Sequence, residues 1–337
     1  MNKNISFLED IPTKEVHLEL YIDESKERLY NGEKITYIMA MAIPTEKKNT
    51  LFDKINNARC LSDTPHNFKE CSINCKYHTS NNIEIHYSNT NRDRTTNSIA
   101  QRWIDILLEN NFQNNNAIFF NILGINETRL NINRFGDKDQ FANIYCRFFR
   151  TTILRLLRMF NSFDKIIVDK IYHDSTNEME SHPYFKTSAI KKITLQEIFK
   201  TERKIFFETN EINFIDSNHK VSGLNESQFI QFVDLILGCT TNAIHNIADN
   251  KNKKALTEKI YPLISRILGA KKDNNSYYNF FNKQTISFFP KYSEENSRKL
   301  FNSLSPTILE DLLHSSANFE NTKALLFHPN DNQISFF

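Results

Sequence analysis

Cysteine, glycine and proline are scarce in this sequence, and each scarcity excludes a class of protein. The five Cys are an odd number in a chain of 337 residues. Met1 to Pro12 contains no apolar segment typical of a signal peptide, so a disulfide framework is not expected. No run of eighteen apolar residues is present, and we expect a cytoplasmic protein that does not cross a membrane. With only six Gly and eight Pro, long stretches should form regular structure, chiefly helix.

Strong net charge and several widespread catalytic motifs are also lacking. A net charge of +2 means that any attraction to nucleic acid must come from local patches. The sequence holds no P-loop, no dinucleotide-binding G-x-G-x-x-G, no G-x-S-x-G and no H-E-x-x-H. What is abundant is Phe, with 28 residues against one Trp. This abundance favours a Phe-rich core over a set of rings for stacking on bases.

The apolar pattern predicts strands and helices that alternate along the chain. Segments 16–24 and 34–43 read as strands, and the Asn31-Gly32 pair between them predicts a hairpin. Further strands are expected at 83–87, 117–123, 165–169, 211–216 and, at a sheet edge, 285–289. Helices are expected at 98–110, 139–160, 195–204 and 226–246, with a helical tail beyond residue 254.

This order of elements predicts an α/β protein in which a mixed sheet is flanked by helices. We expect one domain over residues 1–250, with an insertion of short helix and loop at about 50–82. Residues 251–337 are expected to form a helical C-terminal extension packed on the same domain.

Three aspartates stand where the surrounding pattern predicts burial. Asp23 follows L-Y-I on the first strand, Asp169 ends the strand I-I-V, and Asp234 lies inside F-V-D-L-I-L. A buried carboxylate is costly unless a cation, a hydrogen-bond donor or a proton compensates it. Singly, each could instead cap a helix or form a salt bridge. Strand ends are where ligand sites of open α/β sheets lie, and the helix 226–246 would bring Asp234 to the same point.

Converging carboxylates suit Mg²⁺ or Mn²⁺, which prefer oxygen ligands. Two such ions would support hydrolysis of a phosphodiester bond by metal-activated water. On the helix 226–246, Gln228, Gln231 and Asp234 recur every third residue and form a polar seam through an apolar segment. Gly238, one turn later, would let this helix approach the sheet closely.

Four short motifs in this sequence resemble those of a large prokaryotic family. They are Y-I-D-E-S at 21–25, V-D at 168–169, D-S at 216–217 and Q-F-V-D-L-I-L-G at 231–238. The family is largely uncharacterised and carries a Y-I-D-E-S-G opening, a Q-L-A-D-L-I-A-G helix and an RNase H-like fold. The similarity spans about residues 16–246, with the motifs in the family's order. It implies that the mixed sheet is RNase H-like.

The resemblance also implies roles for matching residues. The implied metal ligands are Asp23, Asp169 and Asp234. Glu24 and Glu84 are the further implied catalytic carboxylates. Ser88 matches the Ser of a family E-x-K-x-S pattern, and with Gln231 it is a candidate for substrate contact. Two positions depart from the family: Lys26 replaces a Gly after D-E-S, and His86 replaces a Lys. These departures concern substrate contact rather than the aspartates.

Basic residues on the helix 139–160 suggest a second kind of contact. Arg147, Arg150, Arg155 and Arg158 fall within about 140° of one another, opposite the Phe face. They predict a phosphate-binding stripe, since guanidinium groups match phosphate oxygens, or alternatively a solvated basic face.

A cysteine cluster raises the question of zinc. Cys60, Cys71 and Cys75 lie near His66 and His78, and thiolates and imidazoles suit Zn²⁺. No C-x-x-C knuckle is present, so the sequence favours ordinary reduced cysteines in a loop over a structural zinc site.

The sequence favours a metal-dependent nuclease that uses Mg²⁺ or Mn²⁺ and acts on nucleic acid. The resemblance suggests an anti-phage or mobile-element setting, in which a partner protein of a defence system would be present. One alternative is a catalytically silent RNase H-like module that binds nucleic acid or a partner protein. Another is an enzyme that acts on small phosphate esters. The sequence fixes neither the oligomeric state nor the choice between DNA and RNA.

Overall fold

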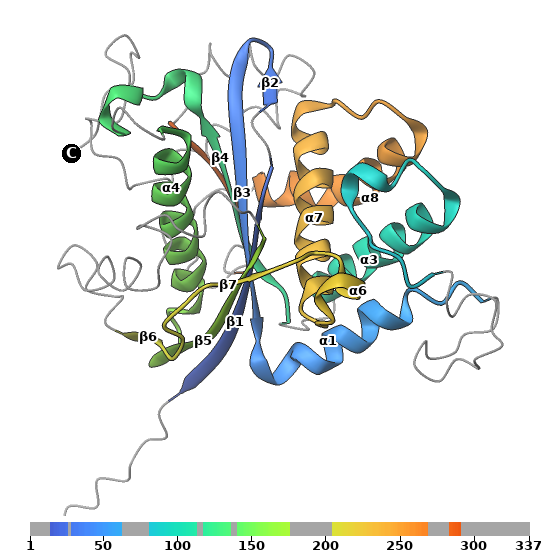
Figure 1. Cartoon of the computed structure of the whole chain (residues 1–337), viewed down its shortest axis with the longest axis horizontal. Helices are drawn as coiled ribbons and strands as arrows, with labels where there is room; N and C mark the ends of the chain where they lie inside the picture. Colours follow the sequence, from blue (N-terminus) through green and yellow to red (C-terminus); the bar gives the residue numbers. More distant parts are fainter. Residues whose placement is uncertain are drawn as a thin grey trace, which may run out of the picture.

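The computed structural model describes residues 14–25, 28–62, 81–112, 117–135, 140–175, 204–268 and 283–290. Within these ranges the chain forms one eight-stranded sheet with helices on both faces (Figure 1). None of the helices described is long and apolar enough to cross a membrane.

The sheet is mixed, with antiparallel strands at its centre and parallel strands on both sides. Its strands run in the order β6-β5-β1-β3-β4-β8, with β2 beside β3 and β7 beside β5. The strands are β1 (Glu15–Glu24), β2 (Arg28–Tyr30), β3 (Glu33–Pro44), β4 (Phe119–Asn126), β5 (Lys165–Asp174), β6 (Ile205–Phe207), β7 (Asn213–Ile215) and β8 (Gln284–Phe289). β3 is antiparallel to β1 and β4, whereas β5 is parallel to β1 and β8 is parallel to β4. The predicted α/β class with a mixed sheet is therefore confirmed.

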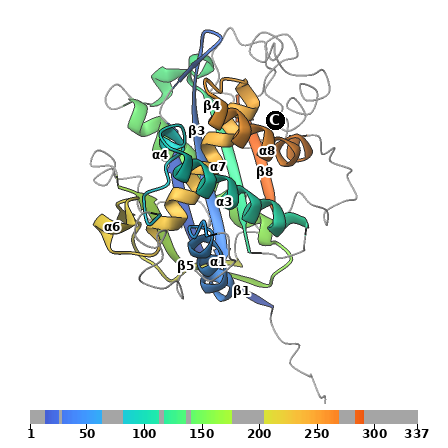
Figure 2. The ribbon, with the colours of Figure 1, turned by 90° about the vertical axis from the view of Figure 1, so that its right-hand side faces the viewer.

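Helices cover the two faces of the sheet unequally. The longer ones are α1 (Thr45–Asn57), α3 (Arg94–Phe112), α4 (Gln140–Leu157), α7 (Ser227–His245) and α8 (Lys251–Leu268), with a short α6 (His219–Ser222). The remaining short turns are 3-10 helices at Tyr87–Asn89, Glu127–Arg129, Ile132–Phe135 and Arg158–Phe160. α4 lies on one face, and α1, α3, α7 and α8 lie on the other (Figures 1 and 2).

Two hydrophobic cores follow from this arrangement, one on each face of the sheet. On the α7 face, Tyr21 of β1 and Tyr172 of β5 pack with Phe229 and Phe232 of α7. On the α4 face, Ile22 of β1 and Ile171 of β5 pack with α4 side chains such as Phe149. Successive residues of a strand point to opposite faces, so these neighbours show which face each strand residue occupies.

Several predicted elements are confirmed. Asn31 and Gly32 have positive φ angles of 47° and 87°, as the two central residues of a type I′ hairpin turn require. β8 pairs with β4 at the edge of the sheet, where the segment 285–289 was expected. The part of the C-terminal extension that the structure describes therefore contains a helix, α8, and a strand that completes the sheet.

Other predictions are wrong or fall outside the described residues. The segment 83–87 is not a strand. Of the insertion expected at about 50–82, the first residues belong to α1 (Thr45–Asn57), and residues 63–80 lie outside the described residues. β5 does not end at Asp169 but continues to Asp174. The helix expected at 195–204 lies, apart from its last residue, outside the described residues, as do Lys26, His66, Cys71, Cys75 and His78.

Candidate active site at the carboxyl ends of two strands

The polar seam of α7 binds the segment that was expected to be a strand. The amide of Ile85 donates to Gln231 Oε1 at 2.9 Å, and the amide of Tyr87 donates to Asp234 Oδ2 at 2.6 Å. Alternate amides of this extended segment are thus satisfied by helix side chains rather than by another strand. Gly238 has a related role, since a Cβ there would clash with the ring of Tyr87. The close approach that Gly238 allows is to Tyr87, not to the sheet.

A buried arginine completes this attachment. Arg59 is fully buried and donates to Gln228 Oε1 at 2.9 Å, Gln231 Oε1 at 3.2 Å and the carbonyl of Ile83 at 2.6 Å. Its guanidinium lies 5.0 Å from the Trp103 ring centroid, and burial lowers its pKa to about 9. Gln231, only 1% exposed, also donates to the carbonyl of Ser217. The predicted substrate contact of Gln231 is therefore wrong: this side chain holds the site together.

Asp23, at the carboxyl end of β1, lies near enough to Asp234 of α7 for their charges to interact. Ile22 belongs to the core on the α4 face, so the next residue, Asp23, points to the α7 face. Asp234 lies on α7 one helix turn after Ile230, whose side chain belongs to the core on that same face. Burial, followed by the negative charges of Asp234, Glu24 and Asp174, raises the pKa of Asp23 well above its usual value. The same carboxylates are thus close enough to repel one another.

The third carboxylate of this group is Asp174, not the predicted Asp169. In the parallel pairing of β1 with β5, Ile22 is opposite His173, which places Asp174 beside Asp23. Burial raises the pKa of Asp174 to about 6. Its Oδ1 accepts from the amides of Ser175 at 3.0 Å and Ser217 at 3.2 Å. A continuing strand pattern, K-I-Y-H-D after Asp169, was the sequence signal for this residue.

Glu84 and His86 belong to the extended segment 83–87, and both lie near Asp234. The Ser217 hydroxyl donates to Glu84 Oε1 at 3.0 Å, which connects Glu84 to the residue that also binds Asp174. His86 Nδ1 lies 3.4 Å from Asp234 Oδ2. The exposed Ser88 contacts the same imidazole nitrogen at 2.9 Å. Glu84 thus lies near Asp234, and Ser88 reaches the group through His86. Their roles as a fourth carboxylate and as a substrate contact stay predictions.

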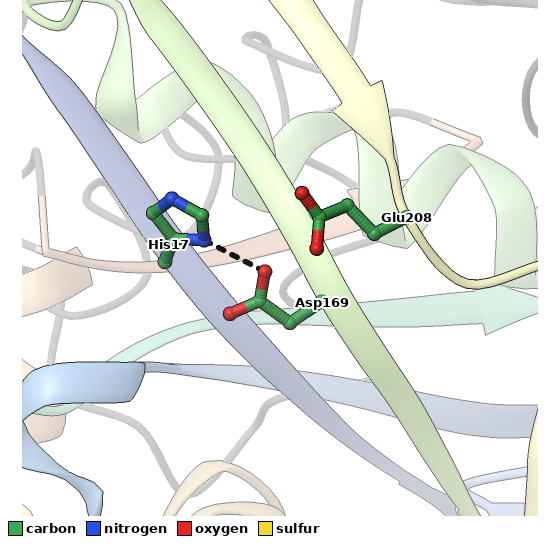
Figure 3. A group of neighbouring side chains, drawn as sticks. All are labelled: His17, Asp169 and Glu208. Carbon is green, nitrogen blue, oxygen red and sulfur yellow. Dashed lines mark hydrogen bonds and ion pairs between the residues drawn. The ribbon is translucent and has the colours of Figure 1, made fainter.

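Asp169 lies several residues away along β5, where the register shifts at Leu18 and Glu19 of β1. This β-bulge leaves Asp169 without a partner residue on β1, and its side chain binds His17 Nδ1 at 2.8 Å and the Thr45 hydroxyl at 2.7 Å. With Glu208, His17 and Asp169 form a group whose ligand atoms lie within 4.8 Å of one another (Figure 3). The prediction that Asp169 converges with Asp23 and Asp234 is wrong, because β5 continues for five more residues.

Replacing Asp169 by Asn tests this correction. We expect metal-dependent cleavage, where it is measured, to stay within about threefold of the original protein, because Asp169 is bound to His17 and Thr45 away from the three aspartates. Asp174→Asn, the same chemical change on the same strand, is expected to abolish cleavage. Loss of cleavage in Asp169→Asn but not in Asp174→Asn would contradict the assignment.

The predicted arginine stripe lies on the wrong face to reach the carboxylate group. Arg147, Arg150, Arg155 and Arg158 are half-buried residues of α4 and of the turn that follows it, on the face opposite α7. Arg147 stacks 5.8 Å from the Phe135 ring centroid. The stripe therefore does not adjoin Asp234. Cys60 is buried, and its predicted neighbours in a zinc site lie outside the described residues.

The charges of the site fit a divalent cation. Asp23 is 7% exposed, and within the described part of the chain no Lys or Arg forms an ion pair with Asp23, Asp174 or Asp234. His86 and Arg28 partly offset the burial that raises the pKa of Asp234. Carboxylate oxygens are the ligands that Mg²⁺ and Mn²⁺ prefer. Among the described residues, however, the side chains close enough together to share one ion are His17, Asp169 and Glu208, not the three aspartates.

A comparison with models of known protein families and with curated proteins gave no match.

Proposed function

We propose that the protein is a metal-dependent nuclease with an RNase H-like core. The observation that carries this proposal is the group of Asp23, Asp174 and Asp234 on one face of the sheet. Asp23 is buried and the other two are half-buried, and none has a lysine or arginine ion-pair partner within the described residues. The mixed sheet, in which β5 is parallel to β1 and β3 is antiparallel to it, is compatible with the RNase H-like fold that the motifs imply.

The three aspartates would hold one or two ions, with Glu84 as a further ligand. A divalent cation there would polarise a phosphoryl oxygen and lower the pKa of a water molecule. Each residue has a distinct task. Ser217 orients Glu84 and Asp174 together, the amide of Tyr87 fixes Asp234, and His86 Nδ1 lies 3.4 Å from Asp234 Oδ2.

Cleavage of labelled single-stranded and double-stranded DNA and RNA tests the proposal. We expect one of these substrates to be cut in the presence of Mg²⁺ or Mn²⁺ and left intact in EDTA. Titration of Mn²⁺ into the same protein, followed by calorimetry, shows independently whether the carboxylates bind metal. Protein that binds Mn²⁺ but cuts only small phosphate esters would change the substrate class. Folded protein that binds no Mn²⁺ and cuts nothing would favour a module that binds nucleic acid or a partner protein.

Metal binding should depend on pH, because the ligands must be ionised. Since the pKa of Asp174 is about 6, we expect Mn²⁺ affinity to rise as the pH increases from about 5 to about 7.5. The usual pKa of this group is 3.8. Because the folded-state pKa lies above the usual one, Asp174 makes the metal-free fold less stable as the pH rises from 3.8 to about 6. In EDTA, Asp174→Asn should raise the melting temperature at pH 8 but not at pH 4. Equal Mn²⁺ affinity at both ends of the pH range would contradict this prediction.

A further inference from the structure

Glu24 directly follows Asp23 but faces the other side of the sheet. Successive strand residues point to opposite faces, so Asp23 points toward α7 and Glu24 points toward α4. Glu24 Oε2 accepts from the Tyr145 hydroxyl of α4 at 3.0 Å and lies 3.3 Å from His173 Nε2 of β5. The Tyr145 hydroxyl and His173 Nε2 are 2.6 Å apart. Three elements therefore meet in one buried polar group.

The side chains of this group are buried, and their polar atoms form hydrogen bonds with one another and with the backbone. His173 has no exposed surface, and Tyr145 is 1% exposed. The second ring nitrogen of His173 bonds to the carbonyl of Asp174 at 2.6 Å. Around it pack Phe149 of α4 and Phe214 of β7. Side chains held on every side in this way have little freedom to turn toward the opposite face.

The position of the group matters because of its chain neighbours. Glu24 adjoins Asp23 on β1, and His173 adjoins Asp174 on β5. The bridge between Glu24 and His173 therefore joins the same two strand ends that carry Asp23 and Asp174 on the other face. Any change in the spacing of these strand ends would change the distance between the two carboxylates.

We propose that Glu24, Tyr145 and His173 are positioning residues that set the separation of Asp23 and Asp174 from the opposite face of the sheet. This inference rests on the proposed function and refines it, because Glu24 becomes a support for the metal ligands instead of a ligand itself. Partners that orient metal ligands typically contribute about 10- to 100-fold to metal affinity.

Binding of Mn²⁺ to Tyr145→Phe and His173→Gln, measured by calorimetry, tests this role. We expect each variant to bind the same number of ions as the original protein, with an affinity about 10-fold to 100-fold lower. Saturating Mn²⁺ should restore cleavage to near the original rate, since the ligands themselves remain. Tyr21→Phe is the matched control: it removes a buried hydroxyl bonded at 2.7 Å to Glu19 of the same strand, away from the aspartates. Its Mn²⁺ affinity should be unchanged.

Three results would overturn the inference, and they differ from one another. Tyr145→Phe and His173→Gln with the original affinity would show that the group does not position the ligands. Glu24→Gln that loses binding entirely, without rescue at saturating Mn²⁺, would make Glu24 a ligand. Absence of Mn²⁺ binding in the original protein would overturn the proposed function itself, and this inference with it. Thermal melting of each variant in EDTA separates these results from a loss of folding.

Discussion

Asp23→Asn is expected to lower metal-dependent cleavage by at least about 1000-fold. Asparagine keeps the shape of the side chain but removes the charge at the point where three carboxylates meet. Loss of several kcal/mol of stabilisation by a bound cation corresponds to a reduction of this size. The measurement is the initial rate of cleavage at saturating Mg²⁺ or Mn²⁺, on whichever nucleic acid the original protein cuts.

The stability of this variant helps to interpret its activity. Because burial and neighbouring charges raise the pKa of Asp23 in the folded state, this carboxyl makes the metal-free fold less stable at pH 8 than at acid pH. Asp23→Asn should therefore melt at the same temperature as the original protein or higher in EDTA. Asp169→Asn is the matched control, with the same substitution on the same sheet. Cleavage by Asp23→Asn at the original rate would mean that the active site lies elsewhere.

Arg59→Ala is expected to lower the free energy of unfolding by about 3–5 kcal/mol. The guanidinium has no exposed surface and donates to Gln228, Gln231 and the carbonyl of Ile83. Removing it leaves buried acceptors without donors, each at a cost of about 1–3 kcal/mol, and opens a cavity beside Trp103. Urea denaturation of the metal-free protein measures the loss.

Two further variants separate the lost hydrogen bonds from the lost volume. Arg59→Met fills much of the space and should still lose most of this stability, because it cannot donate. Arg92→Met makes the same change at an exposed position and should stay within about 0.5 kcal/mol of the original protein. A stability loss in Arg92→Met as large as that in Arg59→Met would refute the role given to buried donors.

The sequence was sufficient to locate two of the three aspartates because their signals are local. Asp23 stands in an alternating strand, and Asp234 interrupts a helix that is otherwise strongly apolar. Asp169 was mistaken for the third because I-I-V-D reads as a strand that ends in a carboxylate. The true end of β5 depends on its pairing with β1 past a bulge and with β7, and neither contact can be read from nearby residues.

The polar seam of α7 shows the same limit. Its period was visible in the sequence, whereas its partners were not: Arg59, Ile85 and Tyr87 come from a distant part of the chain. The segment 83–87 has the alternation of a strand, yet helix side chains take the hydrogen bonds of its amides. A pattern of apolar residues predicts which side is buried, but it does not specify what the backbone binds.

The edge strand β8 has a consequence for how the protein is made. β8 lies against β4, although a long stretch of chain that includes β5, α7 and α8 separates them in sequence. While the chain is still on the ribosome, β4 is already synthesised and its outer edge has no partner from β8. Open strand edges recruit other chains, so this interval is when a chaperone would matter most. A premature stop codon shortly before β8 would therefore yield an aggregation-prone product rather than a slightly shortened protein.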